Sequence, residues 1–336
     1  MRIGVMCSGG DAPGMNACIR AVVRAAGSGG HEVLGIRRGF QGLIEEDFFL
    51  DVYAPPSAEG ETPLMTLRSV SGISKVGGAI LMSSRSQEFR TEEGQKKGAA
   101  NLVKHRVGGL IVIGGDGSFH GAVALSRHWG GRIVGCPGTI DNDLIGSDFT
   151  IGFSTAVQTA TEAVDKLRDT AQSHERMFLI EVMGRHSGYI GVYTALAAGA
   201  ETVCVPETET NIPQIVAHLK DLKARGKHSV MMVVSEGDEM GDAATIQKKL
   251  EEAGAPFQVR TVVLGHLQRG GSPTAEDRIL ASQCGDFAVK SILSGVSGVM
   301  AGVIGGKCVL TPFEETYAEH RAIPPALLQL LKTLSA

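Results

Sequence analysis

The stretch PGTIDNDL, residues 137–144, sets a hydroxyl and two carboxylates on alternate positions, at Thr139, Asp141 and Asp143. Neighbouring carboxylates repel one another unless a cation or a reaction requires them. If a magnesium–nucleotide complex binds nearby, one carboxylate can accept a proton from an attacking hydroxyl, and the other can bind Mg²⁺ or its water molecules. Thr139 could then donate a hydrogen bond to a transferring phosphoryl group. A turn with Asx caps is the alternative, and it explains Asn142 but not the whole pattern.

Two further segments, CSGGDAPGMN (7–16) and IGGDGS (113–118), place a Gly-Gly-Asp turn between an apolar run and an expected helix. Glycine turns and helix starts present backbone N–H groups to anions, so two of them favour a polyphosphate ligand. One such turn alone would more often be a tight corner. Asp116 would repel a phosphate unless a cation lies between them, and Mg²⁺ binds one or two carboxylates plus substrate phosphates. Asp116 is therefore a candidate Mg²⁺ ligand, with a turn-forming Asp as the alternative.

Basic residues near the ends of expected strands predict a second anionic ligand, because arginine grips phosphate with two parallel hydrogen bonds. Each arginine taken singly is more often a solvated surface residue, and their clustering beside glycines favours binding. Glu236, at the end of an apolar run, is a carboxylate that could bind a sugar hydroxyl. The basic residues are Arg85, Arg90, Arg176, Arg185, Arg260, His266 and Arg269.

Several classes of enzyme are excluded by motifs that the sequence lacks. No GxxxxGK[ST] occurs, and GVIGGKC has the wrong spacing, so the chain is not a P-loop kinase. The HRD and DFG set of protein kinases and the GxSxG elbow of serine hydrolases are also missing. Neither HExxH nor a Cys/His cluster is present, which argues against zinc.

Short β-branched runs alternate with amphipathic segments, which predicts an α/β fold of mainly parallel sheets covered on both faces. With 336 residues the chain is long enough for about two domains. In such folds ligands bind at the carboxyl ends of strands, where the glycine turns fall. The expected strands are 3–7, 109–113, 133–136, 177–182, 203–205, 230–234 and 299–303. The expected helices are 15–26, 95–105, 121–129, 154–171, 187–198, 212–224, 243–253 and 275–294, with a closing helix after Thr311.

Composition and charge indicate where the protein works and which partners it lacks. The net charge of −4 gives no general attraction to nucleic acid or to an anionic membrane. The first residues do not form a signal peptide, and no apolar run is long enough to span a membrane. Six scattered cysteines without a CxxC pair predict reduced, mostly buried thiols and a cytoplasmic location. The segment 54–63, rich in Pro, Ser and Glu, is the best candidate for a surface loop.

Five segments in this order, GGDAPGMN, IGGDGS, PGTIDND, EVMGR and VLGHLQRGGSP, resemble the motifs of bacterial ATP-dependent 6-phosphofructokinases. The likeness runs from about Arg2 to the region of Val309. It implies two Rossmann-like α/β/α domains with the active site in the cleft between them. Residues 1–152 plus 267–310 would form the larger domain, which binds ATP and Mg²⁺. Residues 153–266 plus 311–336 would form the smaller domain, which binds fructose 6-phosphate.

The resemblance also implies the reaction, in which the γ-phosphoryl group of ATP moves to the 1-hydroxyl of fructose 6-phosphate. Asp141 would be the base, with Thr139, Arg185 and Arg85 assisting transfer. The metal ligands would be Asp116 and Asp143. The nucleotide phosphates would be held by Gly10, Arg85, Ser86, Gly115, Asp116, Gly117 and Ser118. The sugar phosphate would be bound by Thr139, Ile140, Asp141, Arg176, Met183, Gly184, Arg185, Glu236, Arg260, His266, Leu267, Gln268 and Arg269. Arg176 and Arg260 would reach into a neighbouring subunit, so a homotetramer is expected.

Two glycines bear on the choice of donor. Relatives that use pyrophosphate have Asp in place of Gly117 and Lys in place of Gly138, and an Asp side chain there would occupy the space of the α-phosphate. Glycine at both positions predicts the use of ATP. The chain departs from its relatives before Arg85, where they commonly read GGTxLG and this sequence reads GGAILM, with Ala79 and Met82.

Bacterial members also have a second nucleotide site between subunits, where ADP activates and phosphoenolpyruvate inhibits. Val52 stands where an arginine is usual, and the loop 54–63 follows it, so we hypothesise a remodelled effector response. Ordinary kinetics with both effectors would defeat this hypothesis. The residues that match this effector site are Arg20, Arg24, Arg168, Glu201, Arg225 and Lys227.

Three other functions fit the sequence less well. Gly117 and Gly138 speak against a pyrophosphate-dependent phosphofructokinase. NAD and lipid kinases share the GGDG turn but lack the TIDND and HxQR segments. A non-catalytic regulatory paralogue would be expected to lose Asp141 or Arg185, and both are present.

Overall fold

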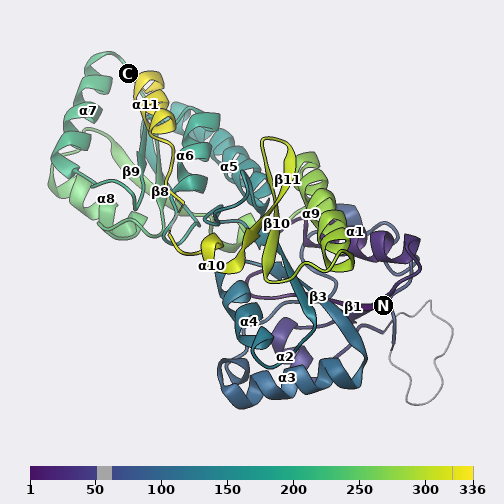
Figure 1. Cartoon of the computed structure of the whole chain (residues 1–336). Coiled ribbons are helices and arrows are strands. Elements are labelled where there is room, and N and C mark those ends of the chain that lie inside the picture. Colours follow the sequence, from purple (N-terminus) through teal and green to yellow (C-terminus); the bar gives the residue numbers. More distant parts are fainter. Residues whose placement is uncertain (51–62, 320, 336) are drawn as a thin grey trace. The chain divides into compact units, whose positions relative to one another are not determined.

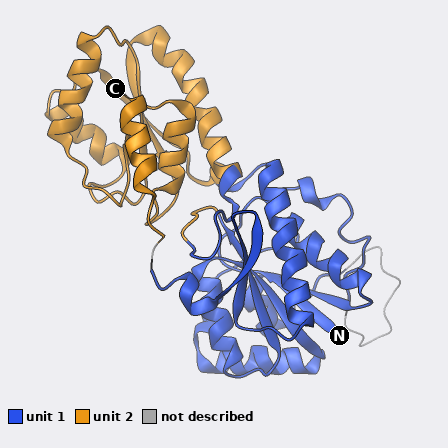
Figure 2. Cartoon of the chain, turned by 45° about the horizontal axis from the view of Figure 1, so that its top comes forward, with its two compact units in different colours: residues 1–139, 144–154, 269–320 blue, residues 140–143, 155–268, 321–336 orange. Residues whose placement is uncertain are grey.

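The computed structural model describes residues 1–50, 63–319 and 321–335. These residues fall into two compact units (Figure 2). Unit 1 comprises Met1–Thr139, Leu144–Ser154 and Arg269–His320, and unit 2 comprises Ile140–Asp143, Thr155–Gln268 and Arg321–Ala336. Val52 and the predicted loop 54–63, apart from Pro63, lie outside the described residues.

Unit 1 is built on a seven-stranded sheet in the order β11-β10-β4-β3-β1-β2, with the short β5 beside β4 (Figure 1). All neighbours run parallel except β10 and β11. The strands β1, β3 and β4 are almost entirely buried, as expected for a sheet covered on both faces. The strands are β1 (Arg2–Cys7), β2 (Glu32–Ile36), β3 (Val107–Gly114), β4 (Arg132–Thr139), β5 (Ile151–Gly152), β10 (Val299–Ile304) and β11 (Lys307–Pro312).

Helices α1 and α9 pack against each other on one face of this sheet, and α2, α3, α4 and α10 share an apolar core on the other. That core contains the stacked rings of Phe40 and Phe89 and of Phe119 and Phe313. The helices are α1 (Met15–Ser28), α2 (Gly39–Glu45), α3 (Glu92–Lys104), α4 (Asp116–Ser126), α9 (Ala275–Leu293) and α10 (Phe313–Thr316), with 3₁₀ turns η1 (Ile73–Lys75), η2 (Glu88–Arg90) and η3 (Gly265–Arg269).

Unit 2 has a four-stranded parallel sheet in the order β7-β8-β6-β9. Helices α7 and α8 bury their apolar residues on one face of it, α6 packs against β8, and α11 packs against α6. The elements are β6 (Arg176–Val182), β7 (Thr202–Cys204), β8 (Val230–Ser235), β9 (Gln258–Val263), α6 (Tyr189–Ala198), α7 (Ile212–Ala224), α8 (Ala243–Glu252) and α11 (Pro325–Leu334), and α5 (Phe153–His174) leads into the unit.

The predicted α/β class with mainly parallel sheets is confirmed. The helix expected at 121–129 begins earlier, at Asp116, and β2, β9, β11 and α2 were not expected. The unit bounds differ from the predicted domain bounds in four stretches, of which two are shifts of two residues: 153–154 belong to unit 1, and 267–268 belong to unit 2. Residues 140–143 belong to unit 2, and residues 311–319 belong to unit 1 because β11 pairs with β10 and Phe313 stacks on Phe119.

Candidate active site

The carboxyl ends of three neighbouring strands gather the predicted residues of unit 1. In the register of the sheet, Cys7 of β1 lies beside Ile113 of β3, and Gly114 of β3 lies beside Pro137 of β4. The first glycine turn, the GGDGS turn and Thr139 therefore follow adjacent parallel strands. This edge of an open α/β sheet is where such folds bind ligands.

A loop of residues 83–86, here called the serine loop, is bound to the first glycine turn. The Ser83 hydroxyl donates to Gly9 O at 2.8 Å, and the Gly9 N–H donates to Ser84 O at 3.4 Å. Arg85, within this loop, is exposed. The structure thus brings Arg85 and the turn at Gly10 into one part of unit 1.

Arg269 lies on the same turn. Its Nη1 donates to Asp11 O at 2.9 Å, and a Cβ added at Gly10 would come within 2.8 Å of that nitrogen. Glycine at position 10 therefore leaves room for the guanidinium. The predicted residues Arg269 and Thr139 belong to unit 1, whereas the other residues expected to bind the sugar phosphate belong to unit 2.

The second glycine turn is the start of α4. Gly115 is the N-cap, no side chain caps the helix, and Asp116 is exposed in its first turn. A Cβ at Gly117 would meet no heavy atom within 4 Å. The Ser118 hydroxyl instead points back to Ser8 O at 2.9 Å, so its side chain fixes the turn. The start of α4 thus has open space beside Gly117 and no side-chain cap, and helix starts of this kind can bind phosphate.

Gly138 and Thr139 end the neighbouring strand β4. A Cβ at Gly138 would come within 2.9 Å of Ile113 Cγ2 and of Met15 Cε, so this position is packed where Gly117 is open. Thr139 lies beside Gly115, and its carbonyl accepts a hydrogen bond from the Thr150 hydroxyl at 2.6 Å.

The residues of unit 2 gather at the carboxyl ends of β6, β8 and β9. Asp141 is 4% exposed, and its carbonyl accepts a hydrogen bond from the Ser187 hydroxyl at 2.8 Å. Arg185 Nε lies 4.0 Å from Asp141 Oδ2, and the Arg185 side chain is 46% exposed. A buried carboxylate beside a solvent-reaching guanidinium is suited to take a proton while the arginine binds an anion.

The turn of residues 183–187, here called the Arg185 turn, follows β6 directly. Gly184 has φ 140° and Arg185 has φ 51°, and the Ser187 N–H donates to Gly184 O at 2.8 Å. A positive φ in a non-glycine residue is a strained conformation that is often found at functional sites. The Arg185 N–H donates to Glu236 Oε1 at 3.0 Å, so Glu236 and Arg185 are held together.

Gln268 supports this turn from inside the unit. It is fully buried, and its Oε1 accepts a hydrogen bond from the Met183 N–H at 2.8 Å. The neighbouring residues His266 and Leu267 are exposed in η3. Arg176 and Arg260 lie further back on the adjacent strands β6 and β9, where Arg176 Nε donates to Gln258 Oε1 at 3.0 Å and Arg260 is exposed.

Four residues predicted for an effector site also lie in unit 2. Glu201 is 3% exposed, and it pairs with Lys227 at 2.5 Å and with Arg168 at 3.5 Å. A pocket of about 340 Å³ is lined by Glu201, Arg225 and Lys227, and the end of α11 contributes Leu334 to it. Sequence analysis attached no role to this C-terminal helix. Arg20 and Arg24 lie on α1 in unit 1.

The prediction that most of the cysteine thiols are buried is confirmed. All six cysteines are free, and all except Cys308 are buried. Burial raises the pKa of the Cys204 thiol to about 12 and raises the pKa of Cys7 further, so both thiols stay protonated. In the part of the chain that the structure describes, no helix has the length and apolar content needed to cross a membrane.

Three residues that support the candidate site were not predicted from the sequence. Ser187 and Gln41 act on predicted site residues only through hydrogen bonds across distant segments, which leave no local signal. Ser84 directly precedes Arg85, so the pattern SSRS, in which Ser86 was already expected to bind phosphate, could have drawn attention to it.

Comparison with known proteins adds independent evidence. The family model described as Phosphofructokinase matches residues 2–292. A protein of Thermus thermophilus named ATP-dependent 6-phosphofructokinase 1 is 50% identical over 334 residues, covering 99% of each chain. An ATP-dependent 6-phosphofructokinase of Shouchella clausii is 46% identical over 338 residues, again covering 99% of each.

Among solved structures, a phosphofructokinase of Pichia pastoris in the T-state matches with a TM-score of 0.84 and 32% identity. The match covers 94% of this chain and 35% of that longer chain. A pyrophosphate-dependent phosphofructokinase of Marinobacter aquaeolei has a TM-score of 0.82 at 21% identity, covering 98% of this chain and 91% of that one, and it supports the fold alone.

Proposed function

The chain belongs to the phosphofructokinase family, and on that premise we propose that it is an ATP-dependent 6-phosphofructokinase. It transfers the γ-phosphoryl group of ATP to the 1-hydroxyl of D-fructose 6-phosphate and so produces fructose 1,6-bisphosphate and ADP. The observation that carries the proposal is the full-length identity to curated enzymes of that name. The geometry of each unit supports a separate part of the reaction.

Unit 1 binds the donor. The uncapped first turn of α4, with open space above Gly117, offers backbone N–H groups to the phosphates of ATP. Arg85 presents its guanidinium from the serine loop, which is bonded to the turn at Gly10. Because phosphoryl transfer needs little covalent chemistry from the protein, positioning and electrostatic stabilisation supply most of the catalysis.

Mg²⁺ would be held by Asp116 and Asp143 together with the nucleotide. Among the described residues, no group of three or more His, Cys, Asp or Glu side chains could hold a metal alone. An exposed carboxylate in the open first turn of α4 fits an ion that is shared with phosphates. When bound, the ion neutralises charge on the transferring phosphoryl group.

Unit 2 binds the acceptor and supplies the base. Asp141 accepts the proton of the sugar 1-hydroxyl, and its burial beside Arg185 keeps bulk water away from that carboxylate. Arg185 and Glu236, held together by the Arg185 N–H, bind the transferring group and a sugar hydroxyl, respectively. Met183, Gly184 and His266 complete the acceptor site.

The remaining proposals concern assembly and setting. Arg176 and Arg260 complete the sugar phosphate site of a neighbouring subunit in a homotetramer. The pocket at Glu201 and Lys227, with Arg168 and Arg225, binds an ADP or phosphoenolpyruvate effector together with Arg20 and Arg24 of another subunit. The enzyme works in the cytoplasm.

The test offers fructose 6-phosphate with ATP–Mg²⁺ and with pyrophosphate–Mg²⁺ in parallel coupled assays. We expect turnover with ATP only. In Asp141→Asn, kcat should fall by about 10²–10⁴-fold, the range for a lost general base. Gly117→Asp should lose the use of ATP, because the carboxylate would stand in the open space over the first turn of α4.

Gly117→Ala is the matched control, since its methyl group meets no neighbour, and it should keep most of the activity. Turnover of wild type with pyrophosphate would overturn the choice of donor. If wild type shows no activity with either donor although it unfolds cooperatively and is therefore folded, a regulatory paralogue would be favoured.

A further inference from the structure

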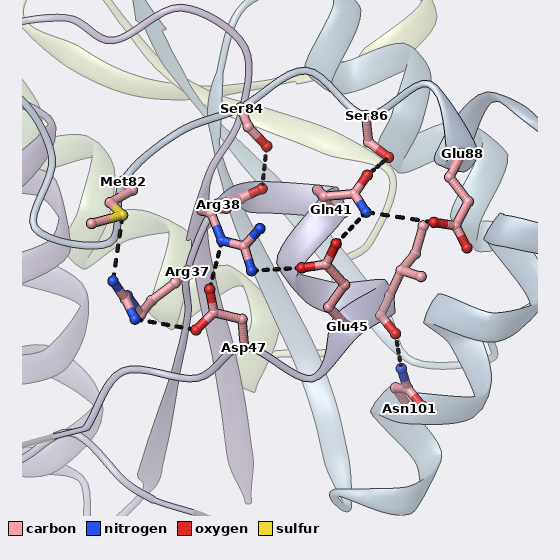
Figure 3. Close-up of polar contacts among 11 residues, drawn as sticks. Arg37, Arg38, Gln41, Glu45, Asp47, Met82, Ser84, Ser86, Glu88 and Asn101 are labelled. Carbon is pink, nitrogen blue, oxygen red and sulfur yellow. Dashed lines mark hydrogen bonds and ion pairs between the residues drawn. The ribbon is translucent and has the colours of Figure 1, made fainter.

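A network of polar side chains on and beside α2 lies next to the serine loop (Figure 3). We call its four members, Arg38, Gln41, Glu45 and Asp47, the α2 network. Arg38 Nε donates to Asp47 Oδ2 at 2.6 Å, and Arg38 Nη2 donates to Glu45 Oε2 at 2.6 Å. Arg38 thereby joins the carboxylate at the end of α2 to the carboxylate that follows the helix.

Gln41 extends the network toward the serine loop, and its neighbours fix the orientation of its side-chain amide. Its Nε2 donates to Glu45 Oε1 at 2.7 Å and lies 3.5 Å from Glu88 Oε2. Ionised carboxylates only accept hydrogen bonds, so the amide nitrogen of Gln41 must face them. Hydrogen bonds from Gln41 and then from Arg38 lower the pKa of Glu45, which keeps it ionised. The amide oxygen of Gln41 is therefore left to face Ser86.

That orientation fixes the Ser86 hydroxyl. Ser86 Oγ donates to Gln41 Oε1 at 2.7 Å and accepts a hydrogen bond from the Phe89 N–H at 3.0 Å. Its single proton is committed to Gln41. Ser86 can thus meet a phosphate only through its backbone, although its side chain is the feature that the sequence offers.

The other side of Arg85 is bonded to the same helix start. The Ser84 hydroxyl donates to the carbonyl of Arg38 at 2.7 Å, and Arg38 holds the left-handed conformation with φ 53°. Both neighbours of Arg85 are therefore bonded to α2 through hydroxyl groups (Figure 3). The backbone on either side of Arg85 is fixed, while its own side chain reaches solvent.

We infer that Gln41 is a positioning residue for the donor, and that the α2 network sets where Arg85 meets the phosphates of ATP. This inference rests on the proposed function, in which Arg85 binds the nucleotide. Gln41 itself does not contact the substrate. Its loss should weaken ATP binding and leave the acceptor side, which belongs to unit 2, unchanged.

The test compares Gln41→Ala with Gln87→Ala in steady-state assays that vary ATP and fructose 6-phosphate separately. Gln87 is the matched control, because it is an exposed amide of the same segment that makes no capping hydrogen bond. Losing one hydrogen bond corresponds to a change of about three- to tenfold. We expect KM for ATP to rise by about that factor in Gln41→Ala, with KM for fructose 6-phosphate within about twofold of wild type and Gln87→Ala unchanged.

Two further variants separate positioning from general damage. Gln41→Glu should weaken ATP binding more than Gln41→Ala, since it sets a third carboxylate against Glu45 and Glu88. Combining Gln41→Ala with Ser86→Ala should add little to either single change, because both remove the same bond. The dissociation constant of a fluorescent ATP analogue, measured without turnover, should rank the variants in the same order.

Three results overturn the inference while wild type remains an active phosphofructokinase. These are an unchanged KM for ATP in Gln41→Ala, equal rises in both KM values, and additive effects with Ser86→Ala. Wild type that lacks activity with ATP would instead refute the proposed function, so the two failures are distinguishable.

Discussion

The serine loop of unit 1 and the Arg185 turn of unit 2 each present an exposed arginine, but they hold it by different means. Three serine hydroxyls bind the loop to Gly9, Arg38 and Gln41. The turn also makes side-chain bonds, through Glu236, Gln268 and the Ser187 hydroxyl, but in addition its backbone holds φ 140° at Gly184 and 51° at Arg185. The position of the loop depends on separate side-chain hydrogen bonds, whereas the position of the turn depends on backbone dihedral angles that few residues can adopt.

This difference predicts which substitutions should reduce stability and activity most. A partly exposed hydrogen bond contributes about 0.5–1.5 kcal/mol, so removing one bond of the serine loop should change ATP binding by a small amount. A backbone that admits only one residue type should fail more abruptly, because an added Cβ forces the chain itself to move.

Gly184→Ala should have the largest effect. A Cβ at this position would lie 2.3 Å from Ser187 O, and φ 140° is a conformation that other L-residues rarely adopt. The turn must rearrange, which moves Arg185 relative to Asp141. We expect kcat/KM for fructose 6-phosphate to fall by about 10²-fold, as for a displacement near 1 Å, and stability to fall by about 2 kcal/mol. Steady-state kinetics and urea unfolding measure the two effects.

Gly254→Ala is the control for Gly184→Ala. Gly254 also has a positive φ, of 75°, but an added Cβ there would meet nothing within 4 Å. It should lose about 1 kcal/mol of stability and keep its activity. Equal kinetics in the two variants would mean that the Arg185 turn tolerates change as well as any loop.

Ser187→Ala should come next. The change removes the hydrogen bond to Asp141 O, which is buried, without adding bulk. We expect kcat to fall by about tenfold with KM for ATP unchanged, since the bond positions the proposed base and not the donor. This split is the reverse of that expected for Gln41→Ala. Ser173→Ala, an exposed serine on α5 that bonds only within its helix, is the control. A rise in KM for ATP in Ser187→Ala would remove the contrast between the regions.

The parts of the molecule that the sequence predicts are those with local signals. Apolar runs ending in Gly-Asp turns located β1 and β3 and the edge of the sheet where the site lies. The start of α4 was missed because Gly-Asp-Gly is typical of a turn, and α2 was missed because two glycines in GFQGLIE lower its helix propensity. Packing of α2 against α3 and of Phe40 against Phe89 overrides that weak preference.

The contacts within the site could not be predicted in the same way. Ser187 bonds a carbonyl that is 46 residues away, and Ser86 bonds a side chain that is 45 residues away. Such pairs depend on how strands and helices are brought together, and no spacing in the sequence encodes them. The residue types at the site were therefore predictable, whereas the residues that support them required the fold. The roles of the site residues remain predictions.

Met82→Gly should have the smallest effect and the opposite sign. Met82 precedes the serine loop, is 47% exposed, and holds the left-handed conformation with φ 56° at the position where relatives commonly have glycine. Its sulfur lies 3.4 Å from Arg37 Nη2, a weak contact. Relief of the strained φ should raise stability by about 1 kcal/mol and leave KM for ATP within about twofold, because the bonds of the serine loop do not involve Met82. Arg106→Gly, with φ 55° on an exposed turn, is the matched control and should gain a similar amount in urea unfolding. If Met82→Gly raises KM for ATP as much as Gln41→Ala does, then the backbone before Arg85 sets the loop, and the serine loop and the Arg185 turn are held by the same means.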